Sequence, residues 1–230
     1  MEIRIDLHTH TTDSNPFGSK VTNTDDNEIM NVLKYHKIDI VCFSDHYDLN
    51  IKKYEQRVLL GKQYKPEIIV WPGIEVDITS LNKNKKAQVV IVFDPHQDIQ
   101  EIRKFCRNNF KPWKNQYFKS ITYKQLVEKL ADFNCLIIPH VGKARDEVSV
   151  EDLIGVRVDA LDTIDLDHKN VLKMRKKGIL APEVYFSDTH DWNNYPQHSY
   201  YYTKLEVEDC SFNSVKKAIT ANKINPINKI

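Results

Sequence analysis

The chain has 230 residues, of which 33 are Lys or Arg and 32 are Asp or Glu, so its formal net charge is only +1. This balance excludes a strongly polybasic or polyacidic protein, and 41% hydrophobic residues with 10% aromatics argue against a disordered chain. The length fits a single domain spanning residues 1–230, and we expect that organisation.

Composition also bears on the cellular compartment. No apolar run approaches the roughly 20 residues of a membrane span, and the N-terminus lacks the basic and apolar stretches of a signal peptide. The four cysteines form no CxxC pair, which argues against a zinc–thiolate site. We therefore expect a cytoplasmic protein with reduced thiols and no membrane partner.

Short apolar runs alternate with longer segments of helical pattern along the chain. Strands are predicted at residues 3–7, 38–43, 68–71, 88–93, 135–138, 158–164 and 184–186, with an extended edge segment at 200–207. Helices are predicted at 25–36, 51–63, 98–108, 122–133, 149–154, 168–177 and 211–221. This alternation predicts an α/β fold with a parallel sheet covered by helices, and seven or eight such units fit a barrel.

Histidine and acidic residues follow five of the predicted strands. His8 and His10 follow the first, Asp45 and His46 the second, Glu75 the third, His140 the fifth, and Asp188 and His190 the seventh. In a βα-barrel these strand ends open on one face, where barrel active sites are built. The pattern therefore predicts that residues more than 180 positions apart converge on one site.

The spacing of His8 and His10, which is repeated by Asp188 and His190, favours a metal ion. In an extended chain, residues two apart point to the same side and lie roughly 6–7 Å apart. Imidazole and carboxylate together suit Zn, Mn or Fe, and a carboxylate such as Glu75 can bridge two cations. Sites with two metals favour phosphoester hydrolysis, because the ions clamp both the attacking and the leaving oxygen.

Five segments resemble the PHP family, the polymerase-and-histidinol-phosphatase metal-dependent phosphoesterases. They are DLHTHTTDS at 6–14, FSDHYDL at 43–49, PGIEV at 72–76, IIPHVGK at 137–143 and FSDTHD at 186–191, and they occur in the family order. The resemblance implies a distorted (βα)7 TIM-like barrel with two to three divalent ions of Mn, Zn or Fe. The chain after Asp191 also resembles PHP domains attached to ATPases, which implies an ATPase partner or a fused ATPase domain.

Metal ligands follow from the resemblance position by position. It implies that His8, His10, Glu75 and Asp188 bind the first ion, that Glu75 and His140 bind the second, and that His46 and His190 belong to a third.

Two positions depart from the family pattern. Gln88 stands where the family often has a histidine ligand of the second metal, and Asn15 stands where it often has Asp or His. Asp13, two residues away, is the candidate substitute for the latter.

The mechanism that follows uses a water molecule activated by metal as the nucleophile. His46 or His190, where free of metal, is the candidate proton donor to the leaving oxygen. Lys143 and Arg145 follow His140 and are candidates to hold a phosphate oxygen, although solvated loop charges are an equally good interpretation.

A basic and aromatic segment at about 101–130 is longer than a barrel connection requires, so we expect an insertion or lid there. Cations for phosphates and rings for bases suit single-stranded nucleic acid; the alternative is a lysine-rich surface over an aromatic core. Its residues are Arg103, Lys104, Arg107, Lys111, Lys114, Lys119, Lys124 and Lys129 with Phe105, Phe110, Trp113, Tyr117, Phe118 and Tyr123.

Three functions remain open from the sequence. The first is a metal-dependent nuclease or phosphodiesterase acting on a phosphate ester such as nucleic acid. The second is a small-molecule phosphatase of the histidinol-phosphatase type. The third is a non-catalytic metal-binding regulatory module, which Gln88 and Asn15 would favour.

Overall fold

The computed structural model describes residues 1–82, 85–110, 120–143 and 146–229. The helices are α1 (Asp26–Tyr35), α2 (Ile51–Gly61), α3 (Ile99–Asn109), α4 (Tyr123–Lys129), α5 (Val150–Leu153), α6 (Lys169–Lys176) and α7 (Phe212–Thr220), with short 3-10 turns η1 (Thr12–Phe17) and η2 (Trp192–Asn194). The strands are β1 (Glu2–Thr9), β2 (Ile40–Phe43), β3 (Ile69–Trp71), β4 (Gly73–Thr79), β5 (Lys86–Phe93), β6 (Cys135–Gly142), β7 (Leu161–Thr163), β8 (Glu183–Val184), β9 (Tyr201–Glu206) and β10 (Ile224–Asn228).

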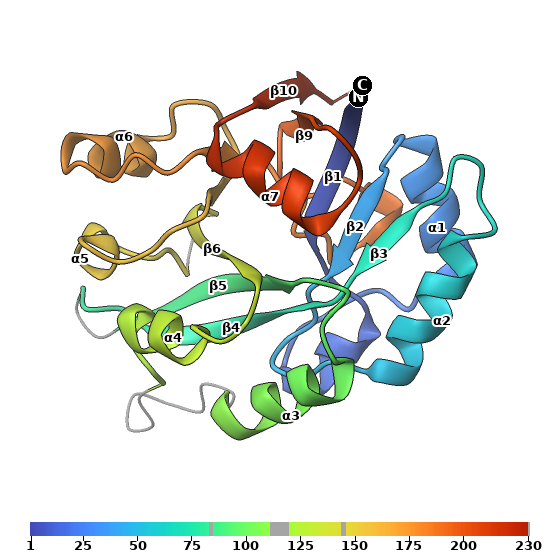
Figure 1. Ribbon diagram of the computed structural model, residues 1–230, viewed down its shortest axis with the longest axis horizontal. Helices are drawn as coiled ribbons and strands as arrows, with labels where there is room; N and C mark the ends of the chain where they lie inside the picture. Colours follow the sequence, from blue (N-terminus) through green and yellow to red (C-terminus); the bar gives the residue numbers. More distant parts are fainter. Residues whose placement is uncertain (83–84, 111–119, 144–145, 230) are drawn as a thin grey trace.

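The strands form two mixed sheets of five strands each, in the orders β10-β9-β1-β2-β3 and β4-β5-β6-β7-β8 (Figure 1). The expected α/β class is confirmed. The strand ladders of the described residues do not run round one closed barrel; instead, isolated bridges from Thr9 to Thr189 and from His46 to Glu75 connect the two sheets at one end.

The expectation of a parallel sheet is only partly met. The pairs β1–β2, β2–β3, β6–β7 and β7–β8 are parallel, whereas β4–β5 and β5–β6 are antiparallel. Only residues 80–85 separate β4 from β5, and a parallel connection needs a crossover of a dozen or more residues. Strand β4 itself was not predicted, and β10, rather than the predicted segment at 200–207, lies at the sheet edge.

The chain passes from one sheet to the other at Pro72-Gly73. A Cβ atom on Gly73 would lie 2.4 Å from Cys42 Sγ and 2.7 Å from the Ile91 carbonyl oxygen. Only glycine therefore allows β4 to pass this close to β2. The close approach lets the Glu75 amide donate to the Asp45 carbonyl at 3.2 Å, which holds Glu75 beside the end of β2.

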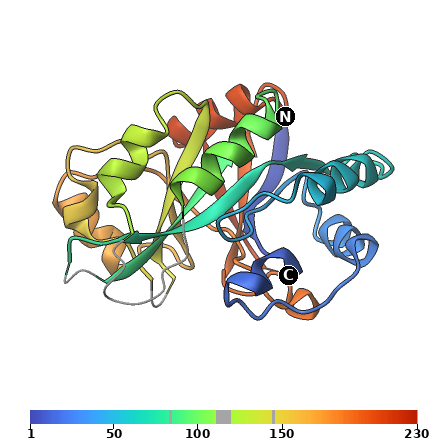
Figure 2. The same ribbon diagram turned by 90° about the horizontal axis from the view of Figure 1, so that it is seen from below.

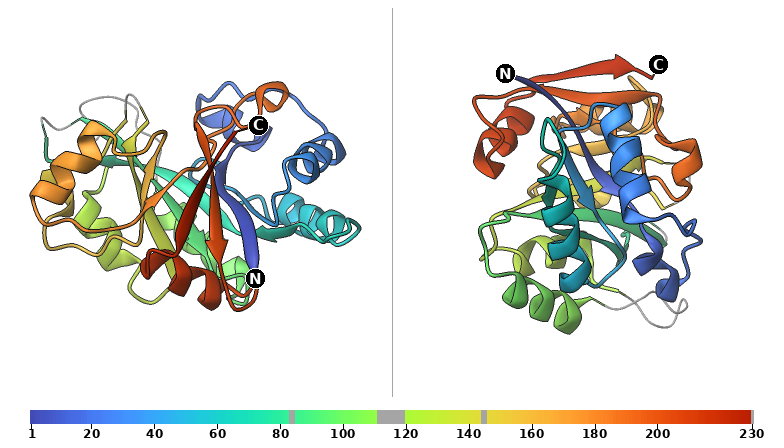
Figure 3. Two further views of the ribbon diagram at one scale, coloured as in Figure 1. Left: turned by 90° about the horizontal axis from the view of Figure 1, so that it is seen from above. Right: turned by 90° about the vertical axis from the view of Figure 1, so that its right-hand side faces the viewer.

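Three apolar clusters hold the elements together. The cluster between the sheets takes side chains from β1, β2, β5 and β6, and α7 covers it with Phe212 and Ile219. Helices α3 and α4 pack on the other face of β4 and β5 (Figure 2), while α1 and α2 cover the outer side of β2 and β3 (Figure 3). The polar site lies at the end of the strands where the two bridges join the sheets.

Local signals in the sequence set several helix starts. The Asp25 side chain accepts from the Asn27 amide, and Thr122 with Gln125 and Ser149 with Asp152 form capping boxes. No helix among the described residues combines the length and the apolar character needed to cross a membrane.

Candidate metal centre

Polar side chains from both sheets meet at the bridged end. His8 lies in β1 and His10 directly after it, Glu75 lies inside β4, and His140 lies inside β6. His46 follows β2, and Asp188 and His190 follow β8. Sequence reasoning placed Glu75 and His140 just after strands; they are in fact strand residues whose side chains face the same space.

Backbone hydrogen bonds hold the segment after β8 against β1, and the segment after β2 against β4. The Asp188 amide donates to the His8 carbonyl at 2.7 Å, and the His10 amide donates to the Thr189 carbonyl at 3.0 Å. The Tyr47 amide donates to the Glu75 carbonyl at 3.0 Å. Residues 180 positions apart in the sequence therefore share one rim.

The first group of donors consists of His8, His10 and Asp188. The two Nε2 atoms lie 3.1 Å apart, and each lies 3.3 Å from Asp188 Oδ1. The HxH spacing thus puts both imidazoles on one side of the strand end, as expected from strand geometry. Asp188 has a φ of 49°, a left-handed conformation that a non-glycine residue adopts at some cost in energy.

Glu75 lies at the centre of the site. Its Oε1 is 2.9 Å from His140 Nε2 and 3.4 Å from His8 Nε2, and its Oε2 is 3.2 Å from His46 Nδ1 and 3.5 Å from His10 Nε2. The two oxygens therefore face different pairs of imidazoles, which is the arrangement that a carboxylate shared between two cations requires.

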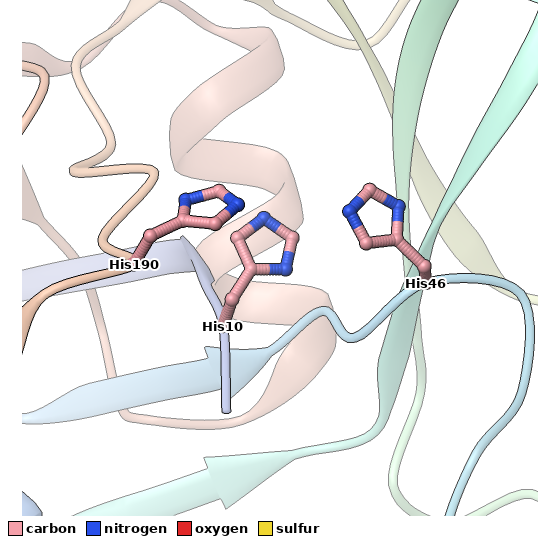
Figure 4. Close-up of side chains that lie close together, drawn as sticks. All are labelled: His10, His46 and His190. Atoms are coloured by element: carbon pink, nitrogen blue, oxygen red, sulfur yellow. The ribbon is translucent and has the colours of Figure 1, made fainter. Parts of the chain in front are cut away.

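His10, His46 and His190 form a second group from three separate segments (Figure 4). The ring of His10 stacks on that of His46 with centroids 4.9 Å apart, and it lies 4.4 Å from that of His190. One nitrogen of each imidazole lies within 4.8 Å of the other two.

Asp162 belongs to the site and was missed by the sequence analysis. It lies in β7 with no exposed surface, and its Oδ2 is 2.8 Å from His8 Nδ1. A third group of donors is formed by His8, His140 and Asp162. Nothing in the apolar segment 158–164 distinguishes Asp162 from Asp159, so only the fold reveals it.

The electrostatics of the site call for positive charge at its centre. Burial alone would raise the pKa values of Glu75 and Asp188, but the surrounding imidazoles hold both well below their usual range. Burial opposes the charged form of His8, yet Asp188, Glu75 and Asp162 outweigh it and raise the pKa of His8 to about 10. Burial lowers the pKa values of His10 and His46 to about 4, so both imidazoles are neutral at pH 7, as metal ligands must be.

The donor set fits a transition-metal ion. Within the described residues, His46 Nδ1, His140 Nε2 and Glu75 Oε1 are buried and make no hydrogen bond. Their near neighbours are ion-pair contacts inside the site, His140 Nε2 to Glu75 Oε1 at 2.9 Å and His46 Nδ1 to Glu75 Oε2 at 3.2 Å, so these atoms are grouped as a shared cation would need them. Neutral imidazole with carboxylate suits Zn, Mn or Fe rather than Ca.

Two sequence candidates lie aside from these groups. Asp13 Oδ1 accepts from Asn50, and its Oδ2 lies 3.6 Å from Arg57, so the structure places Asp13 beside the site and not within its donor groups. Asn15 bonds both the amide and the carbonyl of Val21 and thereby closes its loop.

Gln88 lies opposite Asp77 in the β4–β5 ladder and lines a cavity of about 400 Å³ together with Glu75 and His46. The structure therefore places an amide on the wall of the site at this position.

Lys143 is buried behind His8. Its ammonium group donates to the Phe186 carbonyl and lies 3.3 Å from Asp162 Oδ2. Its charge is thus already paired with the carboxyl group that contacts His8. Arg145 lies outside the described residues.

The basic segment is partly neutralised. Arg103 and Arg107 both bind Asp48, with Arg107 Nη2 at 2.7 Å, and Lys104 pairs with Glu101 at 3.5 Å. These ion pairs support the interpretation as an ordinary surface for α3. Lys111, Trp113, Lys114, Tyr117, Phe118 and Lys119 lie outside the described residues.

No family model and no curated protein sequence matches the chain. Solved structures do match its fold. The lesion-specific endonuclease Q of Pyrococcus furiosus aligns over 97% of this chain at 18% identity with a TM-score of 0.65, and the chain spans only 58% of that protein. PsfC of Pseudomonas syringae aligns over 99% of this chain and 92% of its own at 14% identity, with a TM-score of 0.64.

A third match is a two-domain protein of Bacteroides vulgatus that contains a predicted PHP-like metal-dependent phosphoesterase. It covers 99% of this chain and 65% of its own at 10% identity, with a TM-score of 0.58. At these identities the likeness concerns the fold, and it agrees with the family that the five sequence segments resemble. The chain therefore has the fold of a PHP-type domain.

Proposed function

We propose that this protein is a metal-dependent phosphoesterase that hydrolyses phosphodiester bonds, with nucleic acid among its substrates. The observation that carries the proposal is the convergence of His8, His10, Glu75, His140 and Asp188, whose ring nitrogens and carboxylate oxygens face one another at 2.9–3.5 Å in the interior of the site. Fold similarity to an endonuclease and to a PHP-like phosphoesterase supports the reaction class. A distorted barrel remains our interpretation of the two bridged sheets.

The family resemblance divides the residues into groups that would hold separate ions. His8, His10, Glu75 and Asp188 would hold one divalent ion, Glu75 and His140 a second, and His46 and His190 a third. When bound, such ions supply Lewis acidity that activates water and offsets charge on the phosphoryl group in the transition state.

Where free of metal, His190 is better placed than His46 to protonate the leaving oxygen. Both line the site cavity, but the side chain of His190 is 28% exposed, whereas that of His46 is 9% exposed and packs against Glu75. Because burial lowers the pKa of His46 to about 4, its imidazole carries no proton to give at pH 7.

Lys143 would position another residue of the site. Its ammonium group faces Asp162 and the Phe186 carbonyl, so we propose that it orients Asp162 against His8. For Arg145, contact with a phosphate oxygen stays a prediction, and so does an ATPase partner or fused ATPase domain. The C-terminal segment that suggested an ATPase forms β9, α7 and β10, which complete the first sheet and cover its core.

Hydrolysis of bis-p-nitrophenyl phosphate and p-nitrophenyl phosphate by protein loaded with Mn, Zn or Fe tests the proposal. We expect metal-dependent cleavage of the diester. The His8→Ala variant should lose more activity than the roughly 10–100-fold that is typical when a residue supporting a metal ligand is replaced. His96→Ala is the matched control, because the His96 side chain is 84% exposed and contacts only Asp94 in the described part of the chain.

Equal, metal-independent rates for wild type and His8→Ala would refute the proposal. Faster turnover of the monoester would favour the small-molecule phosphatase. Metal binding without turnover of either ester would favour the regulatory module, which the amide of Gln88 on the cavity wall also supports.

A further inference from the structure

A second cavity adjoins the metal centre. It has a volume of about 340 Å³ and is lined by Lys143, Ile164, Asp188 and the segment 197–200. This volume falls within the range of about 300–1,000 Å³ that is usual for small-molecule sites. The cavity that contains Gln88, Glu75 and His190 is also lined by Asp188, and the two cavities share no other lining residue.

This arrangement suits an ester with two substituents. A phosphoryl group at Asp188 would border both cavities, so each organic group of a diester could enter its own cavity. A monoester would leave one of them to water.

The wall formed by residues 197–200 is held in place by the metal-binding segment. Gln197 Oε1 accepts from the amides of His190 at 2.8 Å and Asp191 at 3.0 Å, and the His198 amide donates to the Ser187 carbonyl at 2.8 Å. The Tyr200 amide donates to the Ile164 carbonyl at 3.1 Å. The cavity is therefore preorganised, which lowers the entropy cost of binding a ligand there.

Tyr200 offers an aromatic face at the mouth of this cavity. The residue is 62% exposed, and its ring makes no ring contact within the described residues. Its neighbours differ: Tyr195 stacks on Trp192, Tyr201 contacts Tyr185, and Tyr202 contacts His36. Tyr200 is thus the tyrosine of this region with a ring still available for stacking.

We propose that this second cavity is a nucleoside subsite, in which the base stacks on Tyr200 while the attached phosphate lies at Asp188 and the metal centre. A base has an apolar face for the tyrosine ring, and its polar edges match the imidazole of His198. This inference rests on the proposed phosphodiesterase function and adds the place where a nucleoside of the substrate binds.

Calorimetric titration of Mn-loaded protein with thymidine 5′-monophosphate and with methyl phosphate tests the subsite. We expect wild type to prefer the nucleotide by about 10-fold, which corresponds to about 1.4 kcal/mol. Tyr200→Ala should bring the preference to about 2-fold or less, and Tyr200→Phe should retain it, because stacking needs the ring and not the hydroxyl. Tyr35→Ala is the matched control, because Tyr35 is 81% exposed and lines neither cavity.

Equal wild-type affinities for the two ligands would overturn the subsite, as would a preference that survives in Tyr200→Ala or disappears equally in Tyr200→Phe. The proposed function fails by a different result, namely no metal-dependent hydrolysis of bis-p-nitrophenyl phosphate. The two failures are therefore read from separate measurements.

Discussion

Asp162→Asn tests whether the carboxyl group behind His8 supports metal binding. Both oxygens of Asp162 accept hydrogen bonds: Oδ2 lies 2.8 Å from His8 Nδ1 and 3.3 Å from Lys143 Nζ, and Oδ1 accepts from the Phe186 amide at 3.2 Å. An asparagine must therefore turn its NH2 group toward a donor in either orientation. Because Asp162 has no exposed surface, no water relieves the conflict.

Two effects follow from this geometry. One unsatisfied buried polar group costs about 1–3 kcal/mol, so the free energy of unfolding should fall by that amount. Loss of the partner that orients a histidine ligand typically weakens metal affinity by about 10–100-fold, or about 1.4–2.7 kcal/mol. Urea unfolding measures the first effect, and titration with Mn or Zn against a competing chelator measures the second.

Asp159→Asn separates the two effects. Asp159 accepts from the Ile137 amide at 2.8 Å and pairs with Arg157, away from the donor groups of the site. We expect it to lower stability by a similar amount and to leave metal affinity unchanged. Wild-type metal affinity in Asp162→Asn, or an equal loss of affinity in Asp159→Asn, would show that Asp162 does not act through His8.

Three further predictions follow from the site and its frame. Gln88→His should add an imidazole to the cavity wall and raise the number of bound ions or tighten the weakest by about 10-fold, as measured by metal analysis and titration; no change relative to Gln88→Ala would contradict this. Gly73→Ala should lower the free energy of unfolding by about 1–3 kcal/mol, because the new Cβ would lie 2.4 Å from Cys42 Sγ; an unchanged urea midpoint would be inconsistent with the close approach of β4 to β2. A divalent ion at 100 times its dissociation constant should stabilise the fold by about 2.7 kcal/mol, seen as a higher melting temperature that a chelator reverses and His8→Ala abolishes; equal melting temperatures with and without the ion would speak against the site.

Local sequence patterns were sufficient to predict how the paired histidines point and where many helices and strands lie. The HxH spacing predicted that His8 and His10 face one side of a strand end, and their Nε2 atoms lie 3.1 Å apart. The helix predicted at 149–154 is present as α5, which begins with a capping box at Ser149 and Asp152. Both depend on residues within one turn or one strand, where steric and hydrogen-bonding preferences act over a few positions.

Long-range features could not be read in this way. The pattern of apolar residues predicts Glu75 after a strand, because it does not show that the chain continues from Gly73 as β4, in an antiparallel ladder with β5. The charge count of α3 suggested a basic surface, yet Asp48, 55 positions before Arg103, neutralises part of it.

By itself, the sequence determined which donor atoms are present and in what order they follow the strands, because side-chain chemistry and strand period are local properties. Tertiary structure alone decided that two separate sheets meet at the rim, that Asp162 contacts His8, and that Asp188 lines two cavities. These features depend on how distant segments pack, and packing is a property of the whole chain that no short window of residues contains.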